Sequence, residues 1–322
     1  MKPTSSSVST AHRSAERTIA NSVGRFGVWS GLDGMPLDAA IDFVRGVEAA
    51  GYSSFWTREG FGRDPFALLA VLSQHTSQLT LGTSIANIYA RDAVGMRDAT
   101  ATLQEFSGGR FVLGLGVSHL PWVEGMRGHE YGRPVEAMRA FLERYRSAPP
   151  YRGPATPAAP ILVGALGPGM VDLAAAASDG AMPYLITAPA VATMRSRLDG
   201  VAASAGRPRP LLAVVQAVLL ETNPERARTA GRSYLAPYLG LPAYRASFER
   251  LGFAASDLEA AGSNRLVDEL IAWGTADQVR AWLSAVLDLG ADHVAIIPLS
   301  ATGTAGDLTV VKRLAPGVHR VG

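Results

Sequence analysis

Glu59 and His119 are the two side chains in this sequence best suited to carry a proton inside an enclosed site. Each follows a short apolar run, Ser54 to Thr57 for the first and Phe111 to Leu115 for the second. Histidine titrates close to neutral pH and is the commonest general acid or base, and a carboxylate can exchange a proton or orient a neighbour. A glutamate after a strand is also a common helix-cap or ion-pair residue, so both roles stay open for Glu59.

A glycine-rich turn offers a second kind of site. It reads Gly164-Ala-Leu-Gly167-Pro168-Gly169-Met170 and separates a short apolar run from an alanine-rich segment of helical spacing. Backbone N–H groups at the start of a helix can bind a phosphate. A tight turn that needs glycine for its positive φ explains the same residues.

Five aromatic residues lie at or near the ends of predicted strands: Trp29, Trp56, Phe61, Tyr89 and Trp122. Their flat faces suit a planar ring system, and core packing is the alternative for each of them. A monomer gains little by exposing five aromatic rings together. We therefore expect these rings to gather around a pocket.

The composition excludes several kinds of chemistry. The chain has no cysteine, which removes disulfides, thiolate metal sites and a cysteine nucleophile. Lys2 and Lys312 are its only lysines, so Schiff-base chemistry inside a barrel lacks a candidate. Neither an HxH pair nor clustered acids follow the predicted strands, and we expect no catalytic metal.

Charge and hydropathy indicate a soluble protein. The net charge is +2 and the 30 basic residues are scattered, which argues against a nucleic-acid partner. No uncharged apolar run approaches the length of a membrane span, and residues 1–24 lack the apolar core of a secretory signal. We expect a cytoplasmic protein without a membrane partner, whose residues 1–24 form a disordered tail.

From Phe26 onward, short apolar runs alternate with longer segments of helical spacing, as in repeated βα units around a parallel sheet. Strands are predicted at Phe26 to Trp29, Ser54 to Thr57, Leu79 to Ile85, Phe111 to Leu115, Ile161 to Val163, Gly180 to Tyr184, Leu211 to Leu220 and His293 to Pro298. Helices are predicted at Leu37 to Gly51, Pro65 to Leu72, Ala99 to Phe106, Pro134 to Tyr145, Val171 to Ala177, Ala190 to Ala205 and Ala276 to Leu289.

Eight βα units fit either a closed barrel or an open doubly wound sheet. An open nucleotide-binding sheet should carry GxGxxG after its first strand, whereas this chain reads Gly31-Leu32-Asp33-Gly34 there. We therefore predict an α/β protein, a (β/α)8 TIM barrel formed by one domain over residues 25–322.

The segment 226–273 is predicted as an insertion of short helices after strand seven, because its prolines and tyrosines interrupt any simple period. Such an insertion could cover the catalytic mouth of the barrel. Packing or a dimer contact explains it equally well.

Three segments resemble the bacterial luciferase-like family of F420- and FMN-dependent oxidoreductases. They are Leu81-Gly-Thr-Ser84-Ile85-Ala-Asn87, Ser107-Gly-Gly-Arg-Phe-Val-Leu-Gly-Leu-Gly116, and Gly167-Pro-Gly-Met170 followed by Asp179-Gly180. The second is the most specific, because the family characteristically runs SGGRF into a fourth strand that contains glycine. In order and spacing, the likeness covers most of residues 26–298 and is weakest in the insertion.

The resemblance implies that the ring of coenzyme F420 or FMN binds at the carboxyl ends of the strands. It also implies a non-prolyl cis peptide at Ser84-Ile85 behind the ring, and a phosphate held at Gly167 to Gly169. The residues expected at the cofactor are Trp56, Glu59, Ser84, Ile85, Asn87, Ser118, Gly164, Gly167, Pro168, Gly169 and Met170. Those expected to line the substrate pocket are Trp29, Phe61, Tyr89, Trp122 and Tyr184.

The chain departs from the sugar-phosphate dehydrogenase branch of that family. Glu59 matches an acidic residue that touches the deazaflavin there, but the catalytic histidine that follows it in that branch is Gly60 here. The branch's acid after strand four is replaced by His119, and the lysines that hold its sugar phosphate are missing. That branch's substrate and proton relay are therefore not expected.

The resulting hypothesis is an enzyme that transfers a hydride between coenzyme F420 and a small organic substrate. His119 would exchange the matching proton, and Glu59 would orient the ring or His119. The alternative enzyme is a monooxygenase that uses reduced FMN and O2, and an alternative of another class is a non-catalytic flavin-binding barrel. Family members commonly pair as homodimers, which is expected of this chain as well.

Overall fold

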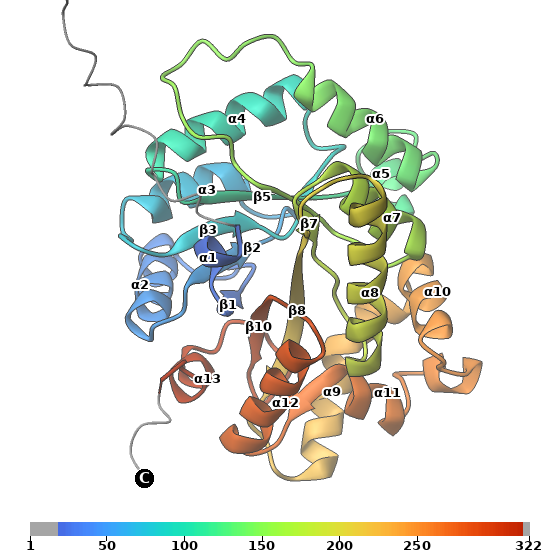
Figure 1. Cartoon of the computed structure of the whole chain (residues 1–322). Coiled ribbons are helices and arrows are strands. Elements are labelled where there is room, and N and C mark those ends of the chain that lie inside the picture. Colours follow the sequence, from blue (N-terminus) through green and yellow to red (C-terminus); the bar gives the residue numbers. More distant parts are fainter. Residues whose placement is uncertain (1–18, 318–322) are drawn as a thin grey trace, which may run out of the picture.

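Eight parallel strands form a closed barrel in the computed structural model, which describes residues 19–317 (Figure 1). The barrel strands are β1 (Phe26–Trp29), β2 (Ser54–Thr57), β3 (Thr80–Thr83), β5 (Phe111–Gly116), β6 (Ile161–Val163), β7 (Gly180–Ala181), β8 (Leu211–Leu219) and β10 (His293–Leu299). The sheet closes because β10 pairs in parallel with both β1 and β8. The predicted (β/α)8 TIM barrel is confirmed.

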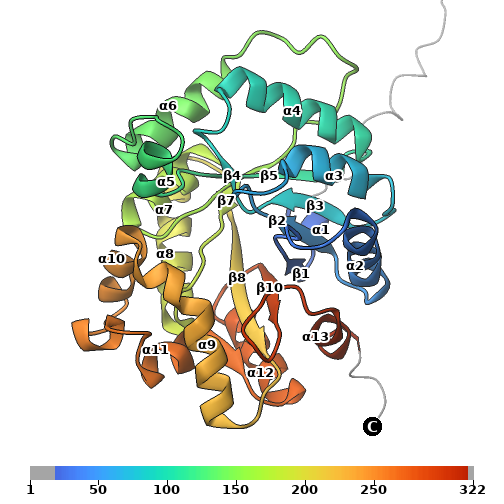
Figure 2. The same ribbon diagram turned by 180° about the vertical axis from the view of Figure 1, so that it is seen from behind.

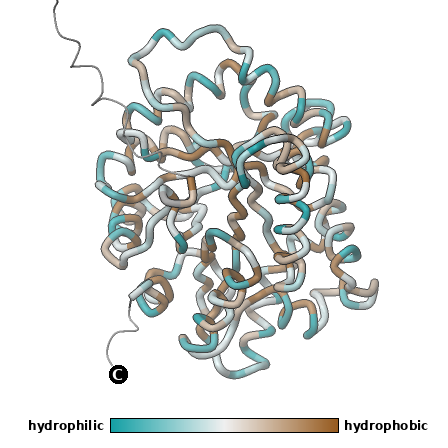
Figure 3. The backbone as a smooth tube through the Cα atoms, viewed as in Figure 1, coloured by the Kyte–Doolittle hydropathy of each residue, from teal (hydrophilic) through white to brown (hydrophobic). Residues whose placement is uncertain are grey.

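Helices surround the strands, as the view from behind shows (Figure 2). They are α2 (Leu37–Ala49), α3 (Pro65–Ser73), α4 (Ala93–Phe106), α6 (Pro134–Arg146), α7 (Pro168–Ala177), α8 (Ala188–Ser204), α12 (Ala276–Asp288) and α13 (Leu308–Arg313). Hydrophobic residues concentrate at the strands in the middle of the molecule (Figure 3). Burial of this apolar surface on both sides of the sheet is what stabilises an all-parallel barrel.

Helices α4, α7 and α8 begin earlier than predicted, and the starts of the first two have local reasons. Helix α4 begins at Ala93 because the Asp92 side chain accepts a hydrogen bond from the Gly95 N–H and caps it. Helix α7 begins at Pro168, a residue that is well tolerated at the first helical position because its missing N–H would have no partner there.

The predicted third strand is shorter than expected. The barrel strand β3 ends at Thr83, and the chain then forms the separate two-residue strand β4 (Ala86–Asn87), which pairs with β5. Ser84 and Ile85 lie between the two strands and leave the regular ladder. This break turns both residues toward the carboxyl end of the barrel.

The chain is ordered earlier than predicted at its amino end. Helix α1 (Ile19–Val23) lies within the expected tail, where Val23 is fully buried and the Thr80 hydroxyl donates to the Ser22 carbonyl at 2.7 Å. The tail boundary at residue 24 was therefore wrong, because these residues pack against the barrel. Residues 1–18 lie outside the described part of the chain.

The predicted insertion consists of helices followed by a strand, drawn in orange in Figure 1. Its elements are α9 (Pro224–Leu239), α10 (Pro242–Arg250), a 3-10 helix η1 (Ala255–Leu258), α11 (Asn264–Leu270) and β9 (Ile271–Trp273). Strand β9 pairs in parallel with the carboxyl half of β8, beyond the part that pairs with β7.

Within residues 19–317, no helix is both long and apolar enough to cross a membrane.

Candidate active site

A cavity of about 470 Å³ opens at the carboxyl ends of the barrel strands, and one of its sides comes from helix α10. The expected site residues that line it are Trp29, Glu59, Phe61, Ser84, Ile85, Ser118, His119, Trp122, Gly164, Gly167, Gly169, Met170 and Tyr184. A concave, mainly apolar space with a few polar groups is typical of a small-molecule site. Its place in the barrel is where enzymes of this fold carry out their chemistry.

The segment between β3 and β4 lines the cavity. The peptide bond between Ser84 and Ile85 is cis, which confirms the expectation for this bond. Three hydrogen bonds fix the segment: the Ser84 N–H donates to Thr57 O at 2.6 Å, the Glu59 N–H donates to Ile85 O at 2.9 Å, and Trp29 Nε1 donates to Ser84 O at 2.9 Å. The neighbouring strand ends thus hold this backbone in one position.

Two glycines make room for the Ile85 side chain. A Cβ atom at Gly116 would lie 2.5 Å from Ile85 Cγ1, and one at Gly164 would lie 3.1 Å from Cγ2. A larger residue at Gly116 would therefore displace Ile85, because such contacts are shorter than packed atoms allow. Gly116, the last residue of β5, thus shapes the cavity.

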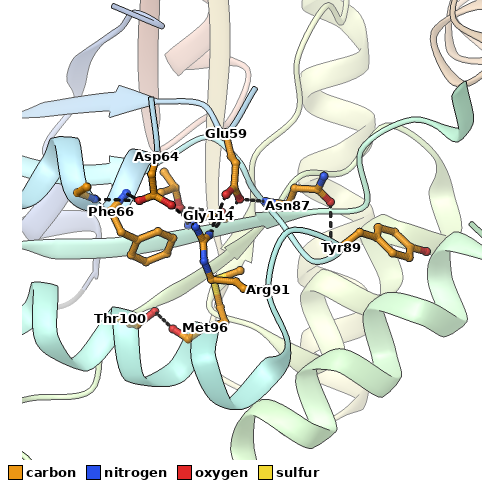
Figure 4. A network of polar contacts seen from close by, with 11 residues as sticks. Glu59, Asp64, Phe66, Asn87, Tyr89, Arg91, Met96, Thr100 and Gly114 are labelled. Atoms are coloured by element: carbon orange, nitrogen blue, oxygen red, sulfur yellow. Dashed lines mark hydrogen bonds and ion pairs between the residues drawn. The ribbon is translucent and has the colours of Figure 1, made fainter. Parts of the chain in front are cut away.

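Glu59 is buried at the edge of the cavity, and both of its carboxylate oxygens are engaged (Figure 4). Arg91 Nη1 lies 2.9 Å from Oε1, and the Asn87 N–H donates to Oε2 at 2.8 Å. Arg91 also pairs with Asp64, the residue that caps helix α3. Burial raises the pKa of Glu59 above its ordinary value, and the Asn87 N–H and Arg91 oppose that shift. The carboxylate holds the loop after β2 against β4.

His119 lines the cavity at the N-cap position of the short helix α5 (Leu120–Gly125), which the sequence did not predict. Its ring contacts the edge of Trp122 at a centroid distance of 4.8 Å and lies 5.5 Å from the ring of Tyr244. Its Nδ1 atom is buried and finds no hydrogen-bond partner among residues 19–317. Burial lowers the pKa of His119 to about 4, so the imidazole is neutral at pH 7 and able to accept a proton.

The glycine-rich turn leads into helix α7 at the opposite wall. A Cβ atom at Gly167 would meet only Arg250 Nη2, at 3.5 Å, and one at Gly169 would meet only Val135, at 3.5 Å. A Cβ atom at either glycine would thus be in ordinary van der Waals contact with a side chain of the cavity wall. Arg250 forms no ion pair within the described part of the chain, and its guanidinium lies beside Gly167 at the start of α7. Pro168 has no N–H and the Met170 and Val171 N–H groups bond to Gly167 O, so the Gly169 N–H is the free donor of this turn.

The insertion adds an aromatic wall to the cavity. Tyr238 of α9 and Tyr244 of α10 line it beside Tyr184, and the Tyr238 and Tyr244 rings meet at a centroid distance of 4.9 Å. The Tyr184 hydroxyl is hydrogen-bonded to that of Tyr234, which lies behind the wall. Burial raises the pKa of Tyr184, Tyr234 and Tyr244 well above the ordinary value, so all three are neutral phenols. The insertion therefore covers part of the mouth.

Trp56 does not line the cavity, which corrects its expected place at the cofactor. Its side chain is fully buried inside the barrel, where Nε1 donates to Ser54 Oγ at 2.8 Å and to His293 Nε2 at 3.1 Å. Its ring fills the space that the missing side chain of Gly82 leaves on the next strand. Trp56 is a core residue.

Three further expected residues lie just outside the cavity. Asn87 is buried and accepts a hydrogen bond from the Tyr89 N–H, so it supports the backbone instead of facing the opening. Tyr89 packs on the ring of Tyr131 and donates its hydroxyl to the Tyr131 carbonyl at 2.5 Å. Pro168 is the first residue of α7 and does not line the cavity.

The cavity residues that were not expected from the sequence include three tyrosines and an arginine, Tyr131, Tyr238, Tyr244 and Arg250. The tyrosines of the insertion carried a usable signal, because Tyr234 and Tyr238 are four residues apart and so share one face of a helix. Arg250 carried none, since only the folded insertion brings it beside the turn at Gly167.

The charged groups of the cavity are few. Arg58 pairs with Asp33 at 3.1 Å and Glu59 pairs with Arg91. Across residues 19–317, no three His, Cys, Asp or Glu side chains come together as metal ligands could. The residues of the cavity can thus exchange a proton at His119, bind an anion near Arg250 and stack a flat molecule on aromatic rings.

Residues 17–293 match the model of the luciferase-like monooxygenase family. The chain therefore belongs to the luciferase-like monooxygenase family, which confirms the resemblance and the expectation of an enzyme.

Similar proteins fall into both cofactor groups. A putative coenzyme F420-dependent oxidoreductase of Mycobacterium tuberculosis is 29% identical over 76% of this chain and 79% of its own length. The fold is similar to the coenzyme F420-dependent tetrahydromethanopterin reductase of Methanopyrus kandleri, with a TM-score of 0.69, 16% identity and coverage of 91% of this chain and 98% of that one. The fold is also similar to the oxygenating part of 3,6-diketocamphane monooxygenase of Pseudomonas putida, whose structure is in complex with FMN. The TM-score is 0.66 and the identity 16%, and the match covers 91% of this chain and 97% of that one.

Proposed function

We propose that this protein is an oxidoreductase that transfers a hydride between coenzyme F420 and a small organic substrate. The observation that carries the proposal is the shape and chemistry of one cavity, in which Ile85 and an aromatic wall face a helix start with Arg250 beside it. The similarity to a putative F420-dependent oxidoreductase favours F420 over FMN.

The residues present fit a deazaflavin cofactor. The cavity of about 470 Å³ is mostly lined by apolar and aromatic side chains, as a planar ring requires. The start of α7 at Gly167 and Gly169 lines the cavity together with the Arg250 guanidinium, a combination that suits a phosphate. A bound deazaflavin would supply the hydride donor or acceptor, which none of the amino acids here can provide.

The protein's own part is to position the reactants and to move a proton. Ser118, Ile85 and Gly164 would lie against the ring, and Gly167, Gly169 and Met170 would hold the phosphate. His119 would exchange the proton, since its neutral imidazole lies in the cavity with Nδ1 unengaged by the residues described. Glu59 would act as a positioning residue, because Arg91 and Asn87 occupy its oxygens.

A monooxygenase that uses reduced FMN and O2 is the second candidate. The similarity of the fold to an FMN-bound monooxygenase favours it, and the cavity would admit either ring. A barrel that binds a flavin without catalysis is distinguished from both by the absence of any turnover.

A titration separates these functions. Purified protein is mixed with oxidised F420 or FMN, and the retained absorbance band and the dissociation constant are measured. We expect one F420 per chain with higher affinity than FMN, and no O2 consumption with reduced F420. Retention of FMN alone, together with O2 consumption by its reduced form, would overturn the proposal.

A further inference from the structure

Two polar side chains on one side of the cavity lack partners. His119 Nδ1 is buried without a hydrogen bond, and the Tyr244 hydroxyl makes none among residues 19–317, although the tyrosine is only 7% exposed. Their rings lie 5.5 Å apart, centroid to centroid. Unpartnered buried polar atoms are rare in native structures because each one costs free energy. His119 Nδ1 is such an atom, and with the unbonded Tyr244 hydroxyl close by at the wall of the cavity it points to a polar atom of a ligand.

The surroundings of this pair are aromatic. Trp122 meets the His119 ring edge-on, and Phe61 meets the ring of Trp122 at a centroid distance of 5.5 Å. The ring of Tyr238 packs against the ring of Tyr244, with the two centroids 4.9 Å apart. A ligand that reaches His119 must therefore present an apolar or aromatic body to these rings.

Two other hydroxyls on cavity residues near this pair are already engaged. The Tyr184 hydroxyl is bonded to that of Tyr234, and the Tyr131 hydroxyl donates to the Ser118 carbonyl at 3.1 Å. Neither of these hydrogen bonds involves His119 Nδ1 or the Tyr244 hydroxyl, which both stay available to a ligand.

The charges of the cavity argue against an anionic substrate at this wall. Arg58 is paired with Asp33, and the remaining cavity cation, Arg250, lies beside Gly167 at the phosphate turn. The aromatic wall carries no cation, and burying an unpaired charge against it would be costly.

We propose that His119 and Tyr244 together hold the reacting oxygen of an uncharged alcohol or carbonyl compound with an aromatic or apolar body. This rests on the proposed function, which names the hydride acceptor. In oxidation, the alcohol O–H bond breaks as His119 takes the proton, and the carbon–hydrogen bond breaks as oxidised deazaflavin accepts the hydride. A C=O bond forms, and Tyr244 donates a hydrogen bond to its oxygen throughout.

The neutral state of both groups suits this role. Burial lowers the pKa of His119 to about 4, so it is a proton acceptor at pH 7, and it raises the pKa of Tyr244, which stays a donor. Tyr184 and Tyr238 pack against the ring of Tyr244, and the Tyr131 hydroxyl bonds to the carbonyl of Ser118, the residue before His119.

The test compares two ligands of nearly equal shape, acetophenone and α-methylstyrene, which differ in having C=O or C=CH2. Binding is measured by calorimetry to protein saturated with oxidised F420, which cannot reduce the ketone. We expect about tenfold tighter binding of the ketone in the wild-type protein, from two neutral hydrogen bonds. An anionic sulfonate of acetophenone should bind more weakly than the ketone.

Variants assign the effect to the two residues. Tyr244→Phe and His119→Leu should each remove about a threefold share of the preference, measured as the ratio of the two affinities within each variant. Tyr234→Phe is the matched control, because its hydroxyl lies behind the wall, and it should keep the preference. Equal affinities of the two ligands in the wild-type protein, a Tyr244→Phe protein that keeps the full preference, or tighter binding of the sulfonate would overturn the proposal.

The same titrations without cofactor separate the two proposals. If F420 fails to bind but the ketone preference survives in cofactor-free protein, the proposed function fails and the oxygen-binding pair stands. If F420 binds and the preference is absent, only the inference about His119 and Tyr244 is overturned.

Discussion

Arg91 Nη1 lies 2.9 Å from Glu59 Oε1, and this pair joins the loop after β2 to the chain that follows β4. The side chain of Glu59 is 7% exposed and that of Arg91 is 19% exposed, so the pair is largely shielded from water. Removing one partner of such a pair leaves the other charge poorly compensated. The pair therefore supports the cavity edge from behind.

We predict that Glu59→Gln lowers the free energy of unfolding by about 1–3 kcal/mol, because the hydrogen bond from Asn87 survives and the charge opposite Arg91 is lost. Urea denaturation measures the change, with Glu143→Gln, an exposed carboxylate of α6, as control. The pH profile of turnover should stay as in the wild-type protein. Unchanged stability with abolished turnover would show instead that Glu59 takes part in the chemistry.

Replacing His119 by Gln should lower kcat by about 100- to 10,000-fold, the usual contribution of a general acid or base. Cofactor affinity should stay near the wild-type value, because the phosphate site is built on α7. Steady-state kinetics and a cofactor titration measure the two effects. Wild-type turnover in the variant would remove His119 from the mechanism.

The low pKa of His119 sets the expected pH dependence. The base must be neutral for oxidation, and with a pKa of about 4 it is neutral throughout the range where free histidine titrates. We predict that kcat/KM for oxidation is flat from about pH 6 to pH 8. A fall of kcat/KM below about pH 6.5 that is absent in His119→Gln would contradict the lowered pKa of His119.

Arg250→Ala should weaken F420 binding by about 10- to 100-fold, the loss expected for a charge-assisted hydrogen bond. A ring analogue that lacks the phosphate should bind both proteins equally. Arg139→Ala, an exposed arginine of α6, is the control. Equal losses for the cofactor and the phosphate-free analogue would place Arg250 away from the phosphate.

The alternation of strands and helices made the cavity partly predictable. Apolar runs and glycine stops are local signals, so the ends of β2, β5 and β6 were found, and with them Glu59, His119 and the turn at Gly167. Trp56 was misplaced because a four-residue strand buried on both faces has no alternation to show which side chains point inward.

Other features depend on contacts that the sequence does not display. Tyr244 and Arg250 reach the cavity only through the fold of the insertion, and β9 forms because β8 extends beyond β7. The short polar segment before Val23 gave no periodic signal, yet it packs against the barrel. Long-range packing overrides local preference in each case.

His293 is fully buried at the start of β10, where Nδ1 lies 2.8 Å from the Gly24 carbonyl and Nε2 accepts from Trp56 Nε1. These contacts suit a neutral imidazole, and burial lowers its pKa to about 4. The neutral group contributes stability that is complete above the unfolded pKa of about 6.5 and is lost as the pH falls toward 4, by about 3 kcal/mol.

We therefore predict that His293→Gln flattens the fall in the free energy of unfolding between about pH 7 and pH 4.5, measured by urea denaturation at each pH. The exposed His75→Gln should follow the wild-type curve. An equally steep loss of stability in His293→Gln would assign the acid sensitivity to other groups.

A crystal structure of the protein with coenzyme F420 tests the central claim most directly. The account predicts the deazaflavin ring against Ile85, within reach of His119, and its phosphate at the Gly169 N–H, next to Arg250. A ring bound elsewhere, or a cavity that stays without F420 at saturating concentration, would contradict it.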